Sequence, residues 1–148
     1  MTKPTIRLQE FRTKRGQRAK SAPEHRFWGR HVHLVKLDTL EVAYLEAKRN
    51  NGAPGSDGET FEAIEARGRG EFLAEIAAEL REGRYAPKRY RRREIPKESG
   101  RVRVISIPAI RDRVVQGALR LVLEPIFEAD FSGSSYGARP GRSAHEAI

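Results

Sequence analysis

Five arginines flank a possible turn at residues 97–100 and form the clearest chemical pattern in this sequence. They are Arg91, Arg92, Arg93, Arg101 and Arg103. Alternating side chains on both sides of Gly100 predict two antiparallel strands over 89–96 and 101–108. Such a ribbon would place several guanidinium groups within reach of one phosphate chain, and arginine binds phosphate oxygens through paired hydrogen bonds. The alternative is an exposed edge strand whose charges only prevent pairing with other strands. The spacing does not separate these two interpretations.

A second group of polar and aromatic residues lies near the C-terminal end, in a loop expected over 132–141. It contains Tyr136 and Arg139, and Arg142 follows it directly. An aromatic ring beside two arginines is suited to stacking on a base and binding its backbone. The alternative is an ordinary turn rich in glycine and proline.

No residue pattern predicts a catalytic group or a metal site in this chain. Cysteine is absent, which excludes disulfides, thiolate nucleophiles and cysteine-based zinc sites. His31 and His33 have no third ligand nearby, and no pair of carboxylates stands at a strand end where it could share Mg²⁺. Neither a P-loop lysine motif nor a G-x-G-x-x-G motif occurs. We therefore expect binding chemistry rather than catalysis from these residues.

The charge of the chain is concentrated in two segments. The 148 residues have a formal net charge of +9, and 38% are hydrophobic, as in one small globular domain. Residues 1–33 contain nine Lys and Arg against two acids, and residues 81–103 contain ten against three. Excess positive charge of this kind predicts a nucleic-acid partner. No apolar run approaches a membrane span, and the polar N-terminus lacks the apolar core of a signal peptide, so a cytoplasmic location is expected.

The elements that must position these residues can be predicted from apolar spacing. Residues 1–33 show no sustained apolar period and are expected to be a flexible basic extension that orders on an RNA or DNA backbone. Helices are predicted from residue 34 to about 47, over 71–81, and from about 109 to 123, where Pro125 should end or kink the last one. The dense turn residues of 51–60 predict a loop. The fold class is α+β, with helices packed around a basic antiparallel hairpin.

The last residues have the pattern of a helix start. Ser143 and Glu146 form a capping box, but the sequence ends at Ile148, less than two turns later. Because one helical turn buries little surface, a helix of that length would be marginal. We expect from this that the chain is a truncated part of something longer.

Eight motifs, taken in order, resemble one known family. They are Asn51–Gly58, Gly83–Pro87, Glu94–Lys97, Gly100–Arg103, Ile107–Pro108, Asp112–Gln116, Leu123–Glu128 and Ser135–His145. Their order and compact spacing are similar to the N-terminal part of a group II intron reverse transcriptase/maturase. The resemblance covers about residue 38 to the end, whereas residues 1–33 add only a basic extension.

The resemblance implies a right-hand polymerase. Residues 34–131 would be its fingers region, with the hairpin at about 89–108, and 132–148 a template-proximal loop with the start of a palm helix. Lys97 and Arg103 match the positions that hold the triphosphate of the incoming nucleotide. The loop with Asp57 and Gly58 matches a segment over template and primer. Tyr136, Arg139 and Arg142 match a segment close to the template strand. Arg91, Arg92 and Arg93 are expected to contact RNA because of their place in the basic hairpin, independently of the resemblance.

Some features depart from the family pattern. Val104 stands where proline is common, Ser106 where glycine is common, and Ala138 where phenylalanine is usual. The family's metal-binding aspartates, thumb and maturase region are expected downstream of this sequence, so these residues alone should not polymerise. The complete enzyme would use Mg²⁺, an RNA template or group II intron RNA, a DNA primer and deoxynucleotides, with a palm and thumb polypeptide possible in trans.

Two other interpretations stay open on the sequence. One is a stand-alone RNA-binding or intron-splicing module without a catalytic role. The other is an inert remnant of a decayed element, which could not fold stably because the helical face at 109–123 would lack a palm to pack on.

Overall fold

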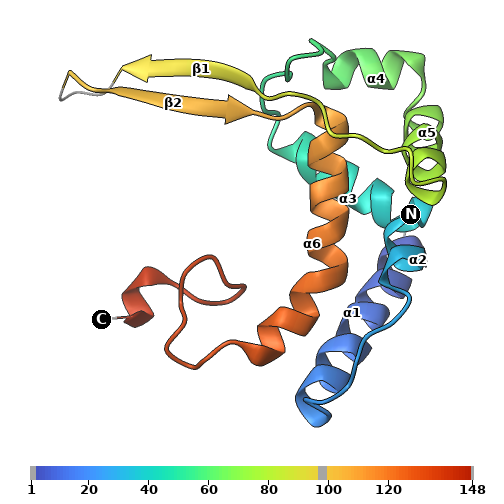
Figure 1. Ribbon diagram of the computed structural model, residues 1–148, viewed down its shortest axis with the longest axis vertical. Coiled ribbons are helices and arrows are strands. Elements are labelled where there is room, and N and C mark those ends of the chain that lie inside the picture. The colour runs from blue at the N-terminus through green and yellow to red at the C-terminus, as the bar shows by residue number, and fades with distance from the viewer. Residues whose placement is uncertain (1–2, 97–99, 148) are drawn as a thin grey trace.

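The protein has the predicted α+β fold, but the helices pack on one another and not around the two-stranded hairpin, which extends away from them (Figure 1). The computed structural model describes residues 3–96 and 100–147. Lys97 and the rest of the predicted turn at 97–99 lie outside the described residues. The elements in chain order are α1 (Lys3–Ser21), α2 (Arg30–Leu34), α3 (Leu37–Arg49), α4 (Phe61–Arg67), α5 (Arg69–Arg81), β1 (Arg91–Pro96), β2 (Val102–Ile107), α6 (Ile110–Asp130) and the short 3-10 helix η1 (Ala144–Ala147).

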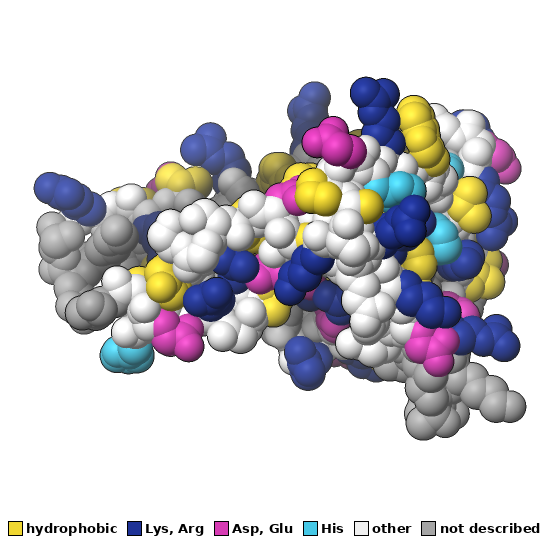
Figure 2. Space-filling model, turned by 90° about the horizontal axis from the view of Figure 1, so that it is seen from below, with side chains coloured by type: hydrophobic (Ala, Val, Ile, Leu, Met, Phe, Trp, Pro, Cys, Tyr) yellow, Lys and Arg dark blue, Asp and Glu magenta, His cyan; other side chains and the backbone are white. Residues whose placement is uncertain are grey.

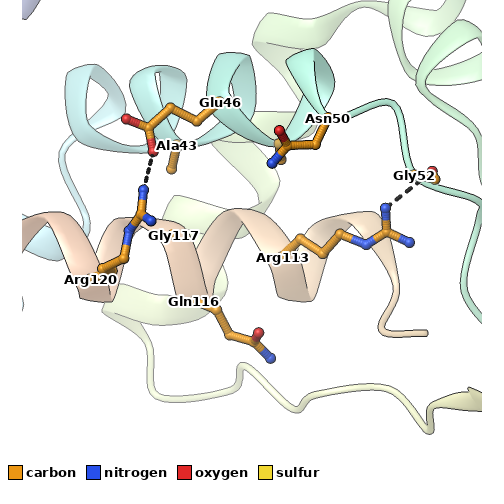
Figure 3. A pocket seen from close by; sticks show the side chains of 9 residues that line it. Ala43, Glu46, Asn50, Gly52, Arg113, Gln116, Gly117 and Arg120 are labelled. Carbon is orange, nitrogen blue, oxygen red and sulfur yellow. Dashed lines mark hydrogen bonds and ion pairs between the residues drawn. The ribbon is translucent and has the colours of Figure 1, made fainter. Parts of the chain in front are cut away.

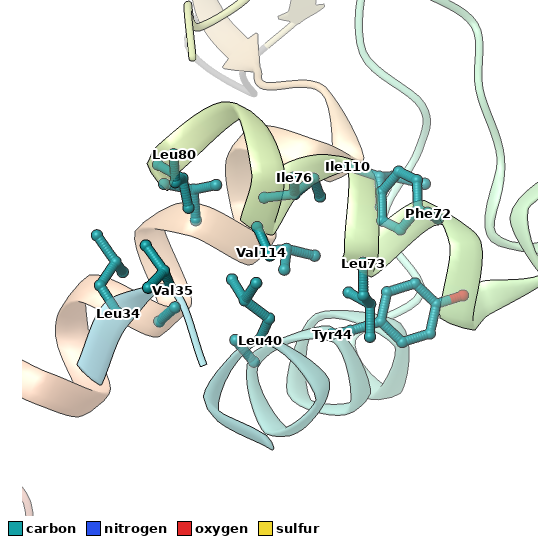
Figure 4. Close-up of a cluster of buried hydrophobic side chains, with 14 of the residues drawn as sticks. Leu34, Val35, Leu40, Tyr44, Phe72, Leu73, Ile76, Leu80, Ile110 and Val114 are labelled. Carbon is teal, nitrogen blue, oxygen red and sulfur yellow. The ribbon is translucent and has the colours of Figure 1, made fainter. Parts of the chain in front are cut away.

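Helix α6 is the centre of the fold, and α1, α2 and α3 pack against it. The closest crossing is with α3, where a Cβ added at Gly117 would lie 3.2 Å from the Cβ of Ala43. Above this crossing, α5 closes a core that includes Leu40, Tyr44 and Val114 (Figure 4). Burying each such side chain contributes about 1.5–3 kcal/mol.

The face of α6 that was expected to lack a partner is covered by the other helices. Val114 and Ala118 are fully buried, and Val115 and Leu121 are nearly so. Most of the apolar stripe at 109–123 thus packs within the described chain, although Leu119 is 39% exposed, so the expected lack of a packing partner is not found for most of this face.

The basic N-terminal segment differs from the irregular chain predicted for it. Residues 3–21 form helix α1, which lies along the lower half of α6 with Leu8 and Ala19 buried (Figure 1). Arg12 forms an ion pair with Glu124 of α6. The buried apolar residues of α1 are few and are separated by many cations, so they form no clear helical period in the sequence. The helix becomes evident only from its packing against α6.

Two further helix predictions were incomplete. Helix α6 continues through Pro125 to Asp130, because Leu121, Val122 and Ile126 are buried on both sides of the proline and hold the helix in place. Helix α4 was not predicted at all. Its N-cap is Thr60, whose hydroxyl accepts a hydrogen bond from the Ala63 N–H at 3.2 Å.

No helix in residues 3–96 or 100–147 is long and apolar enough to cross a membrane.

Candidate nucleic-acid interface

The hairpin divides its arginines between two faces. The observed strands agree with the predicted ones to within two residues, and the antiparallel register places Arg93 opposite Ile105 and Ile95 opposite Arg103. Because side chains alternate along a strand, Arg91 and Arg93 lie on the same face as Arg103. Arg92 lies on the other face. We call the face with Arg91, Arg93 and Arg103 the arginine face.

The cations of the arginine face are exposed and uncompensated. All three side chains are exposed to solvent, and none forms an ion pair with another described residue. Arg92 is likewise exposed and has no such partner. The hairpin therefore offers positive charge to solvent on both faces, with more of it on the arginine face.

A buried carboxylate anchors the segment that leads into the hairpin. Asp112 in α6 is 2% exposed and accepts a hydrogen bond from the Lys88 N–H at 2.9 Å. It also accepts one from the Tyr85 hydroxyl. Burial and this contact with Asp112 raise the pKa of the Tyr85 phenol above its usual range, so the hydroxyl remains the donor at physiological pH.

Arg113 connects the loop at 51–60 to the other end of the hairpin. One terminal nitrogen of its guanidinium donates to the Gly52 carbonyl at 3.1 Å (Figure 3). Its Nε donates to the Pro108 carbonyl, also at 3.1 Å, and the second terminal nitrogen donates to the Ala53 carbonyl. Burial lowers the pKa of the Arg113 guanidinium, although nearby Asp57 acts in the opposite direction. Loop and hairpin base are thus held by one side chain.

The loop also contacts the start of the hairpin directly. The Ser56 hydroxyl donates to the Arg89 carbonyl at 2.6 Å, and the Asp57 carboxylate lies 3.2 Å from the Lys88 ammonium. The Asp57 side chain is only 11% exposed, and the next residue, Gly58, has a φ of 68°. Asp57 therefore binds within the protein, and Gly58 provides the turn that brings it there.

Arg139 is directed into the C-terminal loop rather than toward solvent. Its side chain is 7% exposed, and its guanidinium donates to the Glu128 carboxylate at 2.6–3.1 Å. It also donates to the carbonyls of Ser132 and Ser135, at 2.9 and 2.7 Å. The Arg139 contact lowers the pKa of the Glu128 carboxyl. This arrangement holds the loop on the end of α6.

The other two predicted residues of this loop lie together. The Arg142 guanidinium is 5.3 Å from the centre of the Tyr136 ring, and Arg142 is exposed while Tyr136 is half-buried. The loop and the hairpin extend from opposite ends of α6 toward the same side of the molecule (Figure 1). The backbone N–H of Ser143 donates to the Glu146 carboxylate at 2.9 Å, which is one of the two bonds of the predicted capping box.

We expect Glu128→Gln to loosen this loop without unfolding the protein. The substitution removes the charge that pairs with Arg139, so the loop should open more often and trypsin should cleave after Arg142 about fivefold faster. The melting temperature should change little. Glu71→Gln, at an exposed residue without an ion pair among the described residues, is the matched control. Equal cleavage rates for the two variants would contradict the anchoring role.

Sequence reasoning missed two features. One is the set of residues that position this interface, and the other is a group of aromatic rings near the N-terminus. Asp112 and Arg113 were quoted only as part of a motif. Phe11 stacks on His33 with ring centres 4.0 Å apart, and the Arg15 guanidinium lies 4.8 Å from the centre of the Phe11 ring. The spacing of Phe11 and Arg15 by one helical turn was the available signal. No three His, Asp or Glu side chains come together as metal ligands in the part of the chain that the structure describes.

The fold and this site define a small basic α+β unit with an exposed arginine hairpin braced on a central helix. No family model matches the chain. Protein YkfC of Escherichia coli (strain K12) is 47% identical over 121 residues, which cover 78% of this chain and 32% of that protein. Group II intron-encoded protein LtrA of Lactococcus lactis subsp. cremoris is 32% identical over 149 residues, covering 99% of this chain and 24% of LtrA.

A plant protein shares a shorter region with this chain. Nuclear intron maturase 1, mitochondrial, of Arabidopsis thaliana is 54% identical over 41 residues, or 28% of this chain and 6% of the maturase. The chain is therefore homologous to group II intron-encoded proteins and intron maturases, as its motifs predicted. It spans about a third or less of the length of the relatives named here.

Proposed function

We propose that this chain binds RNA as the fingers region of a group II intron reverse transcriptase/maturase. The observation that carries the proposal is the arginine face, with three exposed guanidinium groups that have no acidic partner among the described residues. Lys and Arg side chains are also scattered over the face seen in Figure 2, among hydrophobic and acidic side chains. Neutralising RNA phosphates with such cations releases counterions, which drives binding without regard to sequence.

The resemblance of the hairpin motifs to the family suggests a more specific role for two cations in the complete enzyme. Lys97 and Arg103 would hold the triphosphate of the incoming deoxynucleotide, as the family resemblance implies. Arg103 is exposed on the arginine face, so its guanidinium is accessible to a ligand. The RNA template and DNA primer would be partners of the complete enzyme, together with a palm and thumb in the same or another polypeptide. The Mg²⁺ that the family implies would be held outside this chain, whose described residues offer no ligand set for it.

The C-terminal loop would contribute to template binding through two residues. Arg142 is exposed and lies over the Tyr136 ring, so the pair offers a charge and an aromatic surface to one nucleotide. Arg139 would act indirectly, since its donors are engaged by Glu128 and the loop carbonyls. We assign Arg139 the role of positioning the loop.

Removing two charges from the arginine face tests the proposal. Arg91→Gln with Arg93→Gln should weaken binding of a labelled single-stranded RNA by about tenfold or more at physiological salt. The slope of log K against log salt should fall by about 1.4, or 0.7 for each lost phosphate contact. Fluorescence anisotropy between low and physiological ionic strength measures both quantities.

The control removes the same charge elsewhere. Arg49→Gln with Arg81→Gln also removes two exposed arginines without ion pairs among the described residues, but they lie at the ends of α3 and α5. The affinity should then fall much less. Equal losses for both pairs would show that binding follows net charge alone, and an affinity independent of salt would refute RNA binding through these cations.

The packing of the helices favours a second candidate, an RNA-binding module that acts without polymerisation. The core formed by α3, α5 and α6 is closed within the described residues (Figure 4). A cooperative thermal transition of the chain by itself would support this module. Arg103→Ala separates the two candidates. If Arg103 positions the incoming nucleotide, its loss should change RNA affinity little; if Arg103 binds the RNA phosphate backbone, as in the module, its loss should weaken RNA binding.

A further inference from the structure

A pocket of about 240 Å³ lies where α1 meets the start of α3, outside the interface described above. Its walls combine two rings, two cations, a carboxylate and a hydroxyl residue. They come from Phe11, His33, Arg7, Lys36, Asp38 and Thr39. We call this the N-terminal pocket. None of the eight family motifs includes a side chain of this pocket, and His33 was considered only as a metal ligand.

One wall of the pocket is the planar imidazole ring of His33. His33 stacks on Phe11 with the ring planes at 24°, and Arg15 lies over the same Phe11 ring. Phe11 thus contacts both His33 and Arg15, whereas no ring other than Phe11 stacks on His33 among the described residues. Burial, then Lys36 and Arg15, lower the pKa of the His33 imidazole, so the ring is neutral at pH 7. A neutral planar ring is suited to stacking on a nucleobase.

The charged groups of the pocket form no ion pairs with one another. Asp38 forms no ion pair and accepts no side-chain hydrogen bond within the part of the chain described. Lys36 and Arg7 likewise have no acidic partner there. The pocket therefore presents two acceptor oxygens and two cations to whatever enters it.

We propose that the N-terminal pocket binds a single unpaired guanine of RNA. The two oxygens of the Asp38 carboxylate match the adjacent N1–H and N2–H donors on the Watson–Crick edge of guanine. The base would stack on the His33 ring where it lines the pocket, while Arg7 and Lys36 bind the flanking phosphates. The inference rests on the proposed RNA binding and adds a base preference to it.

The chemistry of the pocket distinguishes guanine from the other bases and from duplex RNA. Adenine, cytosine and uracil each present a single donor group on this edge, next to acceptors that a carboxylate repels. In a duplex the guanine edge is already paired with cytosine, so only an unpaired guanine can offer both donors. The occupant is therefore a loop, bulge or single strand.

The experiment compares two labelled RNAs on the intact chain. One is an oligouridine and the other is the same oligouridine with one central guanosine. Anisotropy should show about tenfold tighter binding of the guanosine RNA, as for one bidentate base contact. Asp38→Asn should abolish this preference. Asp130→Asn, which removes the same charge from the exposed end of α6, should preserve it.

Substitutions of the stacking ring give a second measurement. His33→Ala should lower affinity for the guanosine RNA by about tenfold, and His33→Phe should restore it, as expected for stacking on an aromatic side chain. If both RNAs bind equally well, or if Asp38→Asn keeps the preference, the guanine site is wrong while RNA binding stands. If oligouridine itself shows no salt-dependent binding, the proposed function fails first. Circular dichroism of each variant separates these results from loss of fold.

Discussion

Asp112→Ala should lower the free energy of unfolding by about 3 kcal/mol, because two donors would lose their buried acceptor and a small cavity would remain. These donors are the Tyr85 hydroxyl and the Lys88 N–H, and Asp112 itself is 2% exposed. Urea unfolding followed by circular dichroism measures the loss. Asp130→Ala, at the exposed end of the same helix, should change stability by less than about 0.5 kcal/mol.

A second substitution identifies the cause of that loss. Tyr85→Phe removes one of the two donors, so Asp112→Ala should be less costly in this background than in the wild type. The two changes should fall short of additivity by about 1 kcal/mol, as for residues in one hydrogen-bond network. Strict additivity would show that the Tyr85–Asp112 contact contributes nothing.

The same variant tests whether the hairpin is positioned by α6. Lys88 immediately precedes the strand that carries Arg91 and Arg93, and its N–H is bound by Asp112. If the orientation of the hairpin matters for RNA binding, Asp112→Ala should weaken the affinity at a temperature where the protein is still folded, although every arginine is retained. An unchanged affinity would mean that the cations act independently of their placement.

Local patterns in the sequence predicted those helices and strands whose apolar side chains repeat regularly along the chain. The apolar stripe from Leu34 predicted most of α3, and the turn residues at 50–52 predicted its end. Alternation around Gly100 predicted both strands. These features depend on neighbours a few residues apart, which a sequence displays directly.

The elements that were missed depend on residues far apart in the chain. Helix α1 packs through Leu8 and Ala19 against α6, and Pro125 stays within a helix because its neighbours are buried there. Arg139 could be read as a template contact, but its acceptor Glu128 lies eleven positions earlier and is brought to it by the loop. Such contacts are determined by tertiary packing, which overrides local preference.

The close approach of the 51–60 loop to α6 depends on a glycine, and we expect Gly55→Ala to lower the free energy of unfolding by about 3 kcal/mol. Gly55 is buried, and an added Cβ would lie 2.5 Å from both the N and Cα of Ala109 and 2.8 Å from the carbonyl carbon of Pro108. All three atoms belong to the backbone at the start of α6, and Ala109 is itself fully buried. The loop must therefore move away, and overpacking of this kind costs about 1–3 kcal/mol, occasionally more.

A glycine with open surroundings provides the contrast. No atom lies within 4 Å of a Cβ added at Gly70 in α5, so Gly70→Ala should stabilise the protein by about 0.5 kcal/mol through the better helix propensity of alanine. Urea midpoints of the two variants should move in opposite directions. Because the displaced loop also carries Ser56 and Asp57 away from the hairpin base, Gly55→Ala should weaken RNA binding as well, whereas Gly70→Ala should not. A Gly55→Ala protein as stable as the wild type would show that the loop does not pack on α6 as described, and the bracing of the hairpin through Arg113 would then need another explanation.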